Sequence, residues 1–392
     1  MKPRILFLSP QPFFQWRGSP IRVNYNLEAL SELGYEVDFL TFPFGDDREI
    51  PGVTIHRAAP LPGVSDLPIG PSLPKLLFDV KLYFAARRLM KTRQYALVHG
   101  VEDAGFFGYF LARNQNARLI YEKHSDPRSY RKGFVRNLIM AVYSRVEAFT
   151  IRRANAVIAT GAGLAQSVQA LCPNTPCHHI CDIPSSHKEA DPQTVQALRA
   201  SLRKHPDEIL ATYVGSFAVY QGIDLLFDAI PEAVRASPDL RVIIIGGSES
   251  EIEARKSALT EKGCADAVSF LGKISPDELP AYLAASDILL SPRISGHNTP
   301  LKLLDYFKAG GAILATDVEA NRLILDNNTA AFAPADPAAF AAALAALARD
   351  PARRKTLAAK GRHLIETTYN FDAYRTQLGA VYDQILDRSA TS

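Results

Sequence analysis

The sequence has few cysteines and no long hydrophobic segment. Its 392 residues contain four cysteines, three of them between Cys172 and Cys181, which is too sparse for a disulfide framework and indicates a reducing compartment. The longest apolar runs, such as 242–245, have the length of a strand and fall far short of the roughly 18 residues that a transmembrane helix needs. Only four apolar residues precede Pro10, too few for the core of a signal peptide. We therefore expect a cytoplasmic protein without a membrane span.

The glycine motifs of two large enzyme classes are also missing. Neither Gly-x-x-x-x-Gly-Lys-Ser/Thr nor Gly-x-Gly-x-x-Gly occurs, so P-loop ATP hydrolysis and dinucleotide-dependent hydride transfer are poorly supported. The stretch 172–181 does hold five possible zinc ligands. Their spacing fits no common zinc module, and small thiols buried in a strand explain them better. We expect no metal site.

Strand-length apolar runs alternate with helix-length amphipathic segments along nearly the whole chain, which is typical of βα units around parallel sheets. The runs lie at 4–8, 36–42, 53–58, 96–101, 118–123, 156–160 and 177–180, and then at 210–215, 241–246, 268–271, 288–291, 312–316 and 330–332. They pause between Asp182 and Asp207. Because this length suits two domains of roughly 150–200 residues, we expect an α/β protein with two Rossmann-like, parallel-sheet domains facing each other across a cleft.

Two helix starts are marked by a hydroxyl residue followed by proline. Ser19 and Pro20 precede an apolar helix at 21–33, and Thr299 and Pro300 precede another at 301–308. Serine or threonine suits the N-cap and proline the first helical position. Either pair alone is explained by an ordinary capped helix. Together, on different domains, the two N-termini predict binding of a shared anionic ligand.

The formal net charge is only +3, but the charges are unevenly distributed. Residues 81–153 include 15 basic and 5 acidic side chains, and such an excess suits an anionic membrane, an anionic substrate or nucleic acid. Since no nucleic-acid recognition motif accompanies it, we expect no nucleic-acid partner. The basic residues flank two apolar helices, at Arg87, Arg88, Lys91 and Arg93, and at Arg128, Arg131, Lys132 and Arg136 before Phe134, Leu138, Ile139 and Val142. These helices either lie on an anionic membrane or pack on the sheet with their charges solvated.

Several motifs follow one another along essentially the whole chain: RGSPIR at 17–22, LSELGYEV at 30–37, YVGSF at 213–217, YQGIDLL at 220–226, FLGKI at 270–274, ASDILLSP at 285–292, NTPLKLLDYFKAG at 298–310 and YNFD at 369–372. In this order they resemble the family-4 glycosyltransferases, which have the two-domain GT-B fold. The resemblance implies an acceptor-binding domain at 1–184, a linker at 185–206, a nucleotide-sugar-binding domain at 207–368, and a segment at 369–392 that crosses back to the first domain.

The resemblance also implies an activity. Members transfer a sugar from a nucleotide diphosphate sugar to a hydroxyl with retention of configuration, generally without metal or cofactor, so anion-binding groups must stabilise the departing diphosphate. The implied acceptor is a glycan or a lipid-linked molecule, with peripheral docking on an anionic membrane. The implied donor-binding residues are Gly18, Ser19, Arg22, Gly215, Gln221, Arg293, His297, Thr299, Lys302 and Asp305. Alternatives on the same fold are a sugar-nucleotide epimerase, a phosphorylase and a catalytically inactive subunit that binds nucleotide sugars.

This chain departs from the family pattern at the donor site. Asp305 stands at the second carboxylate of a Glu-x7-Glu pattern, which is implied to bind the donor ribose, but His297 replaces the first, which touches the transferred sugar. Ser216 and Gln221 replace a basic pair that binds diphosphate, so Lys302, Arg293 or Arg22 must supply the missing charge.

Three polar residues of the first domain follow strands at the edge where parallel sheets bind ligands. His124 follows the run 118–123 and matches the family's active-site histidine, which contacts the donor sugar. We interpret it as catalytic. His99 and Glu102, at the end of the run 96–101, are candidates for the acceptor side.

Overall fold

The computed structural model describes residues 2–13, 18–45, 48–64, 67, 72–126, 134–295 and 300–387, with 134–136 described as backbone alone. The chain forms two compact units. The first comprises Met1–Asp182 and Phe371–Ser392, and the second Ile183–Asn370. No helix in the described ranges is long and apolar enough to cross a bilayer.

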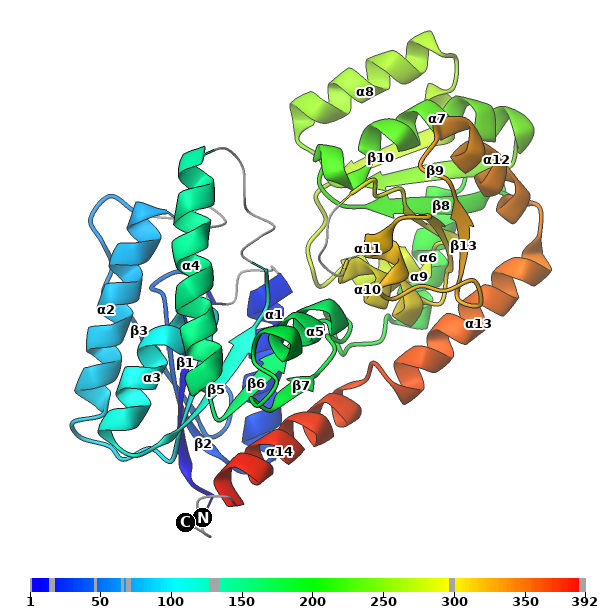
Figure 1. Cartoon of the computed structure of the whole chain (residues 1–392). Helices are drawn as coiled ribbons and strands as arrows, with labels where there is room; N and C mark the ends of the chain where they lie inside the picture. The colour runs from blue at the N-terminus through cyan, green and yellow to red at the C-terminus, as the bar shows by residue number, and fades with distance from the viewer. Residues whose placement is uncertain are drawn as a thin grey trace. The chain divides into compact units, whose positions relative to one another are not determined.

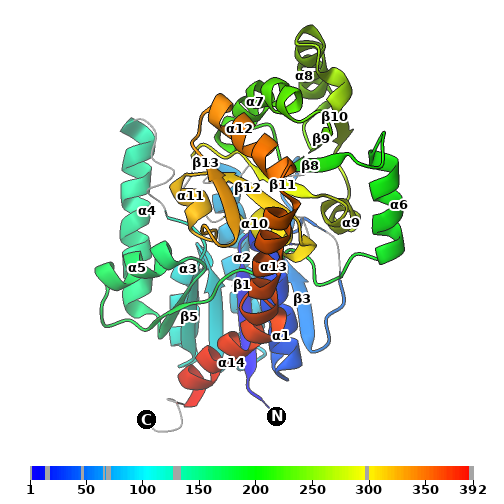
Figure 2. The same ribbon diagram turned by 90° about the vertical axis from the view of Figure 1, so that its right-hand side faces the viewer.

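The first unit is built on a seven-stranded parallel sheet with the order β3-β2-β1-β4-β5-β6-β7. Its strands are β1 Arg4–Ser9, β2 Glu36–Thr41, β3 Val53–Arg57, β4 Leu97–Val101, β5 Arg118–Lys123, β6 Ala156–Ala159 and β7 Cys177–His179. Helices α2 Leu73–Leu89, α3 Ala104–Asn114 and α4 Phe134–Arg153 lie side by side on one face (Figure 1). Helices α1 Gly18–Glu32 and α14 Phe371–Asp387 lie together on the other, while α5 Ala162–Leu171 packs on β6 and β7 (Figure 2). Covering both faces explains why the strands are apolar throughout rather than alternating.

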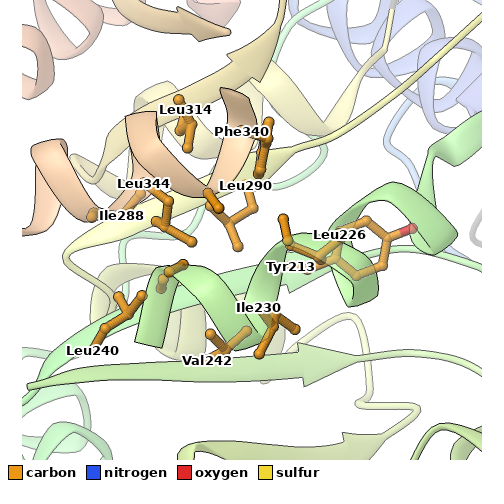
Figure 3. Packing of buried hydrophobic residues seen from close by; sticks show 14 of the residues in the cluster. Tyr213, Leu226, Ile230, Leu240, Val242, Ile288, Leu290, Leu314, Phe340 and Leu344 are labelled. Atoms are coloured by element: carbon orange, nitrogen blue, oxygen red, sulfur yellow. The ribbon is translucent and has the colours of Figure 1, made fainter. Parts of the chain in front are cut away.

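The second unit contains a six-stranded parallel sheet with the order β10-β9-β8-β11-β12-β13. Its strands are β8 Ile209–Val214, β9 Leu240–Ile245, β10 Val268–Gly272, β11 Ile288–Ser291, β12 Ala312–Thr316 and β13 Ala330–Ala333. Its helices are α6 Pro192–Leu202, α7 Ile223–Ala236, α8 Glu249–Glu261, α9 Leu279–Ala284, α10 Lys302–Ala309, α11 Glu319–Arg322, α12 Pro337–Ala348 and α13 Pro351–Thr367, with short 3₁₀ turns η2 Val219–Gln221 and η3 Ala265–Ala267. Side chains from α7 and α12 fill the space over the sheet, for example Ile230 and Phe340 against Val242 and Leu290 (Figure 3).

All thirteen predicted strands are confirmed, to within a residue or two at their ends, and both sheets are parallel as expected. The linker differs from the prediction. Residues 185–206 belong to the second unit, because α6 packs on α9 and its Arg199 forms an ion pair with Asp287. The half-buried carboxylate of Asp287 thus helps to hold this charged helix, together with Leu202, which packs against apolar side chains of the unit.

Both helix starts also differ from the prediction. Helix α1 begins at Gly18, so Ser19 lies in the first turn and not at the N-cap. Helix α10 begins at Lys302 after Leu301 at the N-cap, which places Pro300 before the helix. Thr299 lies outside the described residues.

Candidate functional site

Polar groups collect at the carboxyl ends of the strands in each unit, which is where parallel sheets bind their ligands. In the first unit His124 follows β5 directly. In the second unit Lys302, at the start of α10, lies against the end of β8, with its ammonium 3.2 Å from the carbonyl oxygen of Val214.

The backbone N–H and both ring nitrogens of His124 have polar neighbours. Its backbone N–H donates to Glu102 Oε1 at 2.7 Å, and its Nδ1 lies 3.0 Å from Ser19 Oγ. Its Nε2 lies 3.4 Å from Glu122 Oε1 and has no hydrogen-bond partner in the part of the chain that the structure describes. Glu102 has a positive φ of 50°, uncommon for a residue with a side chain. That turn brings its carboxylate back to the end of β5.

Glu122 is the centre of a buried polar network. Its Oε1 accepts from Arg22 Nε at 2.5 Å, and its Oε2 accepts from Asn26 at 2.8 Å and from His99 at 2.9 Å. Arg22 also donates to Asp182 at 2.9 Å and is only 3% exposed. Burial alone would raise the pKa of Glu122, but Arg22 and the neighbouring histidines lower it well below the usual range. Glu122 is therefore an ionised carboxylate.

The network reaches the C-terminal helix of the same unit. Tyr382 O–H lies 2.6 Å from His99 Nδ1, and Tyr374 O–H donates to Asn26 at 2.7 Å. Burial lowers the pKa of His99, so the ring is neutral, donating from Nε2 to Glu122 and accepting at Nδ1. We call these six residues the Glu122 network: Arg22, Asn26, His99, Glu122, Tyr374 and Tyr382.

The network corrects two of our predictions. His99 is fully buried, so its side chain is not open to an acceptor. Arg22 is buried between two carboxylates that neutralise it and is not an accessible phosphate ligand. His99 lies in the middle of β4, inside the sheet, whereas Arg22 lies in the first turns of α1 and is covered by the packing of α14 over α1.

Two cations come together in the second unit. Lys302 Nζ contacts Gln221 Oε1 at 3.1 Å and lies 4.8 Å from the centre of the Tyr213 ring. The Arg293 guanidinium stacks on Tyr220 at 5.4 Å, and its Nε donates to Ser295 O. Burial, and then the charge of Arg293, lower the pKa of Lys302 to about 7. Within the described ranges, neither cation has a carboxylate partner.

Two glycines shape the backbone around these cations. Gly215 ends the turn after β8 with φ 153°. Gly222 has φ 71°, and a Cβ there would lie 1.8 Å from the carbonyl oxygen of Pro292. This close approach brings the Gln221 turn against the loop that carries Arg293, so only glycine fits the position.

Asp305 has different neighbours from Lys302. Its carboxylate accepts from Ser185 N at 2.7 Å and from Ser185 Oγ at 2.9 Å. Burial raises its pKa to about 6, despite these bonds and the nearby Lys308. The adjoining cavity, between α9, α10 and the 185–190 segment, has about 100 Å³, far below the several hundred that a drug-sized ligand fills. The cavity beside Asp305 is therefore too small for a nucleotide, and among the described residues the contacts of Asp305 differ from those of Lys302.

The remaining predicted residues are distributed as follows. Gly18 and Ser19 open α1, and Ser19 contacts His124. His297 lies outside the described residues, as Thr299 does. Sequence reasoning missed the role of Glu122, although a charged residue inside a buried strand, two positions before His124 and on the same face, is a usable signal. It also missed Ser185 and Tyr382, which carry no local signal.

Comparisons with known proteins cover both units. Residues 16–182 match the family model described as "Glycosyltransferase Family 4", and residues 208–350 match "Glycosyl transferases group 1". A phosphatidyl-myo-inositol mannosyltransferase of Mycobacterium leprae is 28% identical over 168 residues, which is 42% of this chain and 43% of that protein. A D-inositol 3-phosphate glycosyltransferase of Rhodococcus opacus is 30% identical over 184 residues, 43% of this chain and 39% of that protein. The matched regions thus span less than half the length of these relatives.

Solved structures match over nearly the full length. Sucrose-phosphate synthase from Thermosynechococcus elongatus has a TM-score of 0.76 at 20% identity, covering 99% of this chain and 100% of that one. Anabaena Alr3699/HepE in complex with UDP and glucose has a TM-score of 0.72 at 15% identity, covering 98% and 100%. WaaG, a glycosyltransferase involved in lipopolysaccharide biosynthesis, has a TM-score of 0.71 at 16% identity, covering 97% and 99%. At these identities the likeness establishes the GT-B fold.

Proposed function

The chain belongs to the family-4 glycosyltransferases of the GT-B fold, and from this premise we propose that it moves a sugar from a nucleotide diphosphate donor to a hydroxyl acceptor. In this proposal the transfer retains the anomeric configuration and uses no metal or cofactor. The protein works in the cytoplasm, in the assembly of a glycan or glycolipid. The names of the matched relatives, a mannosyltransferase and an inositol phosphate glycosyltransferase, support a hexose donor.

The observation that carries the proposal is the pair of cations Lys302 and Arg293. Burial first, and then the charge of Arg293, lower the pKa of Lys302, so keeping both cations charged in the free protein costs free energy. An anion bound between the two cations offsets this cost. A diphosphate leaving group is the anion that glycosyl transfer generates, so these groups favour the transition state more than the substrate.

His124 is the group that we assign to the reacting sugar in the first unit. The His124 ring follows β5 at the ligand-binding edge of the parallel sheet, and 6% of its side-chain surface stays exposed there for contact with a sugar hydroxyl. His124→Ala should lower turnover at saturating donor. An unchanged rate would contradict this assignment.

The donor is tested first by binding. UDP, GDP, ADP and dTDP are each added, and the nucleotide that raises the unfolding temperature identifies the base. Lys302→Met and Arg293→Met should each weaken that binding, whereas Lys262→Met, which removes a lysine of an exposed ion pair with Asp228 on the same unit, should not. Equal affinities in all four proteins would overturn the assignment of the cation pair.

Activity then separates the alternatives. Incubation with the sugar forms of the bound nucleotide, followed by measurement of free nucleotide diphosphate and of the sugar configuration, gives three distinct results. Nucleotide release with acceptor glycosylation supports a transferase. A changed configuration of the donor sugar without release of nucleotide diphosphate indicates an epimerase. Nucleotide binding with neither nucleotide release nor a change in the sugar indicates an inactive subunit.

We further propose that the first unit docks on an anionic membrane through the face formed by α2, α3 and α4. Ten large apolar side chains on this face are at least a third exposed, and we call them the apolar band: Leu73, Leu76, Leu77, Val80, Phe84, Phe106, Phe110, Leu138, Ile139 and Val142. Eight of them lie in the N-terminal halves of three helices that lie side by side (Figure 1), and Phe84 and Phe110 lie in the C-terminal halves of α2 and α3. Exposed apolar side chains gathered on neighbouring helices mark an interaction surface.

The distribution of charge supports an anionic membrane as the partner of this surface. The C-terminal parts of the same helices carry exposed basic residues: Arg87, Arg88, Arg113, Arg145, Arg152 and Arg153. An apolar band beside a basic one matches the acyl and headgroup layers of an anionic bilayer, where each basic residue contributes up to about 1 kcal/mol. Leu138, Ile139 and Val142 point outward, as membrane docking requires. The side chains of Arg128, Arg131, Lys132 and Arg136 lie outside the description.

Sedimentation with vesicles tests this docking. Binding should require anionic lipid, weaken with salt, and fall in the variant Leu76→Gln, Phe84→Gln, Ile139→Gln. The variant Leu171→Gln, Leu323→Gln removes exposed leucines elsewhere and should bind as wild type does. If wild type stays in the supernatant with anionic vesicles at low salt, the docking proposal is wrong.

A further inference from the structure

A buried ion cluster lies directly beneath His124. Arg22 and Glu122 are 3% and 0% exposed; Glu122 also accepts from the neutral side chains of Asn26 and His99, and Arg22 also donates to Asp182. Burying such a pair brings little net stability, since apolar residues of the same volume often serve equally well or better. Because the pair brings little net stability and lies directly beneath a candidate active-site residue, we look for a role other than stabilising the fold.

The position of Glu122 supplies a reason. Its Oε2 is occupied by two donors, Asn26 and His99, and its Oε1 by Arg22. The carboxylate is therefore fixed in place, with Oε1 facing His124 Nε2 at 3.4 Å. A lone pair on Nε2 would face this anion unfavourably, whereas an N–H would be attracted to it. The arrangement favours a proton on Nε2, while Nδ1 lies 3.0 Å from the Ser19 hydroxyl.

We infer that Glu122 is a positioning residue for His124, setting the orientation and tautomer of the imidazole, while Glu102 fixes the backbone of the same residue. The inference rests on the proposed function, because positioning matters for transfer only if His124 touches the reacting sugar. Glu122 has no exposed surface and meets no substrate. Misplacement of a reacting group by about 1 Å costs up to about 100-fold in rate.

The test removes the charges of Arg22 and Glu122 together, because deleting one of these two fully buried partners leaves the other uncompensated. Asp182, the second carboxylate that Arg22 contacts, also loses its partner but is 15% exposed to solvent. The double variant Arg22→Met, Glu122→Gln keeps the side-chain volumes close to those of wild type. The amide that Glu122→Gln introduces can accept hydrogen bonds from Asn26 and His99 through its oxygen, and it can donate one to His124 Nε2 through its nitrogen. We expect kcat to fall about 10- to 100-fold with little change in the KM for donor.

A spectroscopic readout keeps the test independent of activity. In protein labelled with ¹⁵N-histidine, with the His124 signals assigned through His124→Gln, wild type should show the proton on Nε2 and the double variant should show it on Nδ1. If wild type transfers no sugar, the proposed function fails, and the tautomer still decides whether Glu122 sets the imidazole. Wild-type kcat in a folded double variant that retains the Nε2 tautomer would overturn the inference.

Variants at two further positions, Glu102 and Asp38, distinguish a loss of positioning from a general loss of folding. Glu102→Gln, at a half-buried site, retains an acceptor for the His124 N–H and should lower kcat less than Glu102→Ala, which has none. Asp38→Asn is the matched control, since Asp38 is a buried carboxylate of the same sheet with His56, Arg93 and Tyr95 as partners. It should lower stability without changing kcat or the His124 tautomer. A kcat loss in Asp38→Asn equal to that of the double variant would contradict the positioning role.

Discussion

The Tyr382 hydroxyl lies 2.6 Å from Nδ1 of His99, across 283 positions of sequence. His99 is in the middle of β4 and Tyr382 is in the last helix. This contact joins the end of the chain to the centre of the first unit's sheet and makes α14 part of the Glu122 network.

Removing that hydroxyl should destabilise the protein. Tyr382→Phe leaves His99 Nδ1 as a buried acceptor without a donor, which costs about 1–3 kcal/mol. The unfolding temperature should fall by several degrees. Tyr83→Phe removes a half-buried hydroxyl on α2 for which the described residues provide no hydrogen bond, and it should have little effect. Equal unfolding temperatures for Tyr382→Phe and wild type would show that the contact contributes nothing.

Nucleotide diphosphate affinity should decrease as pH rises above 7. Burial and Arg293 lower the pKa of Lys302 to about 7, so the free site loses its charge as pH rises through this value. A bound diphosphate favours the protonated form, so binding takes up a proton. Between pH 7 and 9, where the ligand's own ionisation is complete, the Kd should rise up to about tenfold per pH unit. Calorimetry in two buffers of different ionisation enthalpy measures the uptake, and Lys302→Arg should abolish it, because arginine stays charged.

Asp305→Asn should stabilise the protein at neutral pH. Because burial raises the pKa of Asp305 to about 6, the folded state binds more protons than the unfolded state between about pH 4 and 6, and this residue's contribution to stability falls as pH rises through that window. The uncharged amide still accepts from Ser185. We expect the free energy of unfolding to increase by about 1–3 kcal/mol at pH 7.5, a gain that disappears near pH 4.

Asp305→Ala should weaken nucleotide diphosphate binding if the carboxylate contacts the ribose, and unchanged affinity would rule that contact out.

Gly222→Ala should disrupt the donor site more than the same change at a left-handed glycine elsewhere. A Cβ at 222 would overlap the carbonyl oxygen of Pro292 at 1.8 Å, so the Gln221 turn must move. Gly263 has a similar φ of 68°, and a Cβ added there would meet no neighbouring atom within 4 Å, so Gly263→Ala costs only the backbone strain of about 1–2 kcal/mol. Unfolding temperature and nucleotide affinity should both fall further in Gly222→Ala. Identical losses in the two variants would mean that the close approach has no role.

His297 tests how the donor sugar is recognised. It stands where the resembled family has a carboxylate, and it lies outside the described residues. If it replaces that carboxylate in function, His297→Ala should lower transfer and His297→Glu should change the preferred sugar or fail. Wild-type behaviour of both variants with every donor would assign the recognition of the sugar to another group.

Local patterns in the sequence determined the strands, their parallel arrangement and the cations of the second unit. A buried parallel strand needs a short, continuous apolar run, and such a run is visible without knowing its neighbours. Lys302 and Arg293 were also accessible to sequence reasoning. Arg293 lies just after β11, and Lys302 opens α10, the helix that follows this strand; strand ends and the following helix starts lie at one edge of a parallel sheet. These inferences depend on local sequence only.

Tertiary structure alone decided which polar residues are buried and which remain open. Arg22 and Glu122 are 100 positions apart, and Ser185 and Asp305 are 120 apart. Each was interpreted as an exposed ligand or not at all, because burial depends on what packs over a residue and not on its own sequence. The return of α14 over α1 encloses Arg22 and His99, and the close packing of the 185–190 segment occupies the carboxylate of Asp305. The desolvation of a polar side chain and the identity of its hydrogen-bond partners depend on such long-range contacts, so they are established only when the chain is folded.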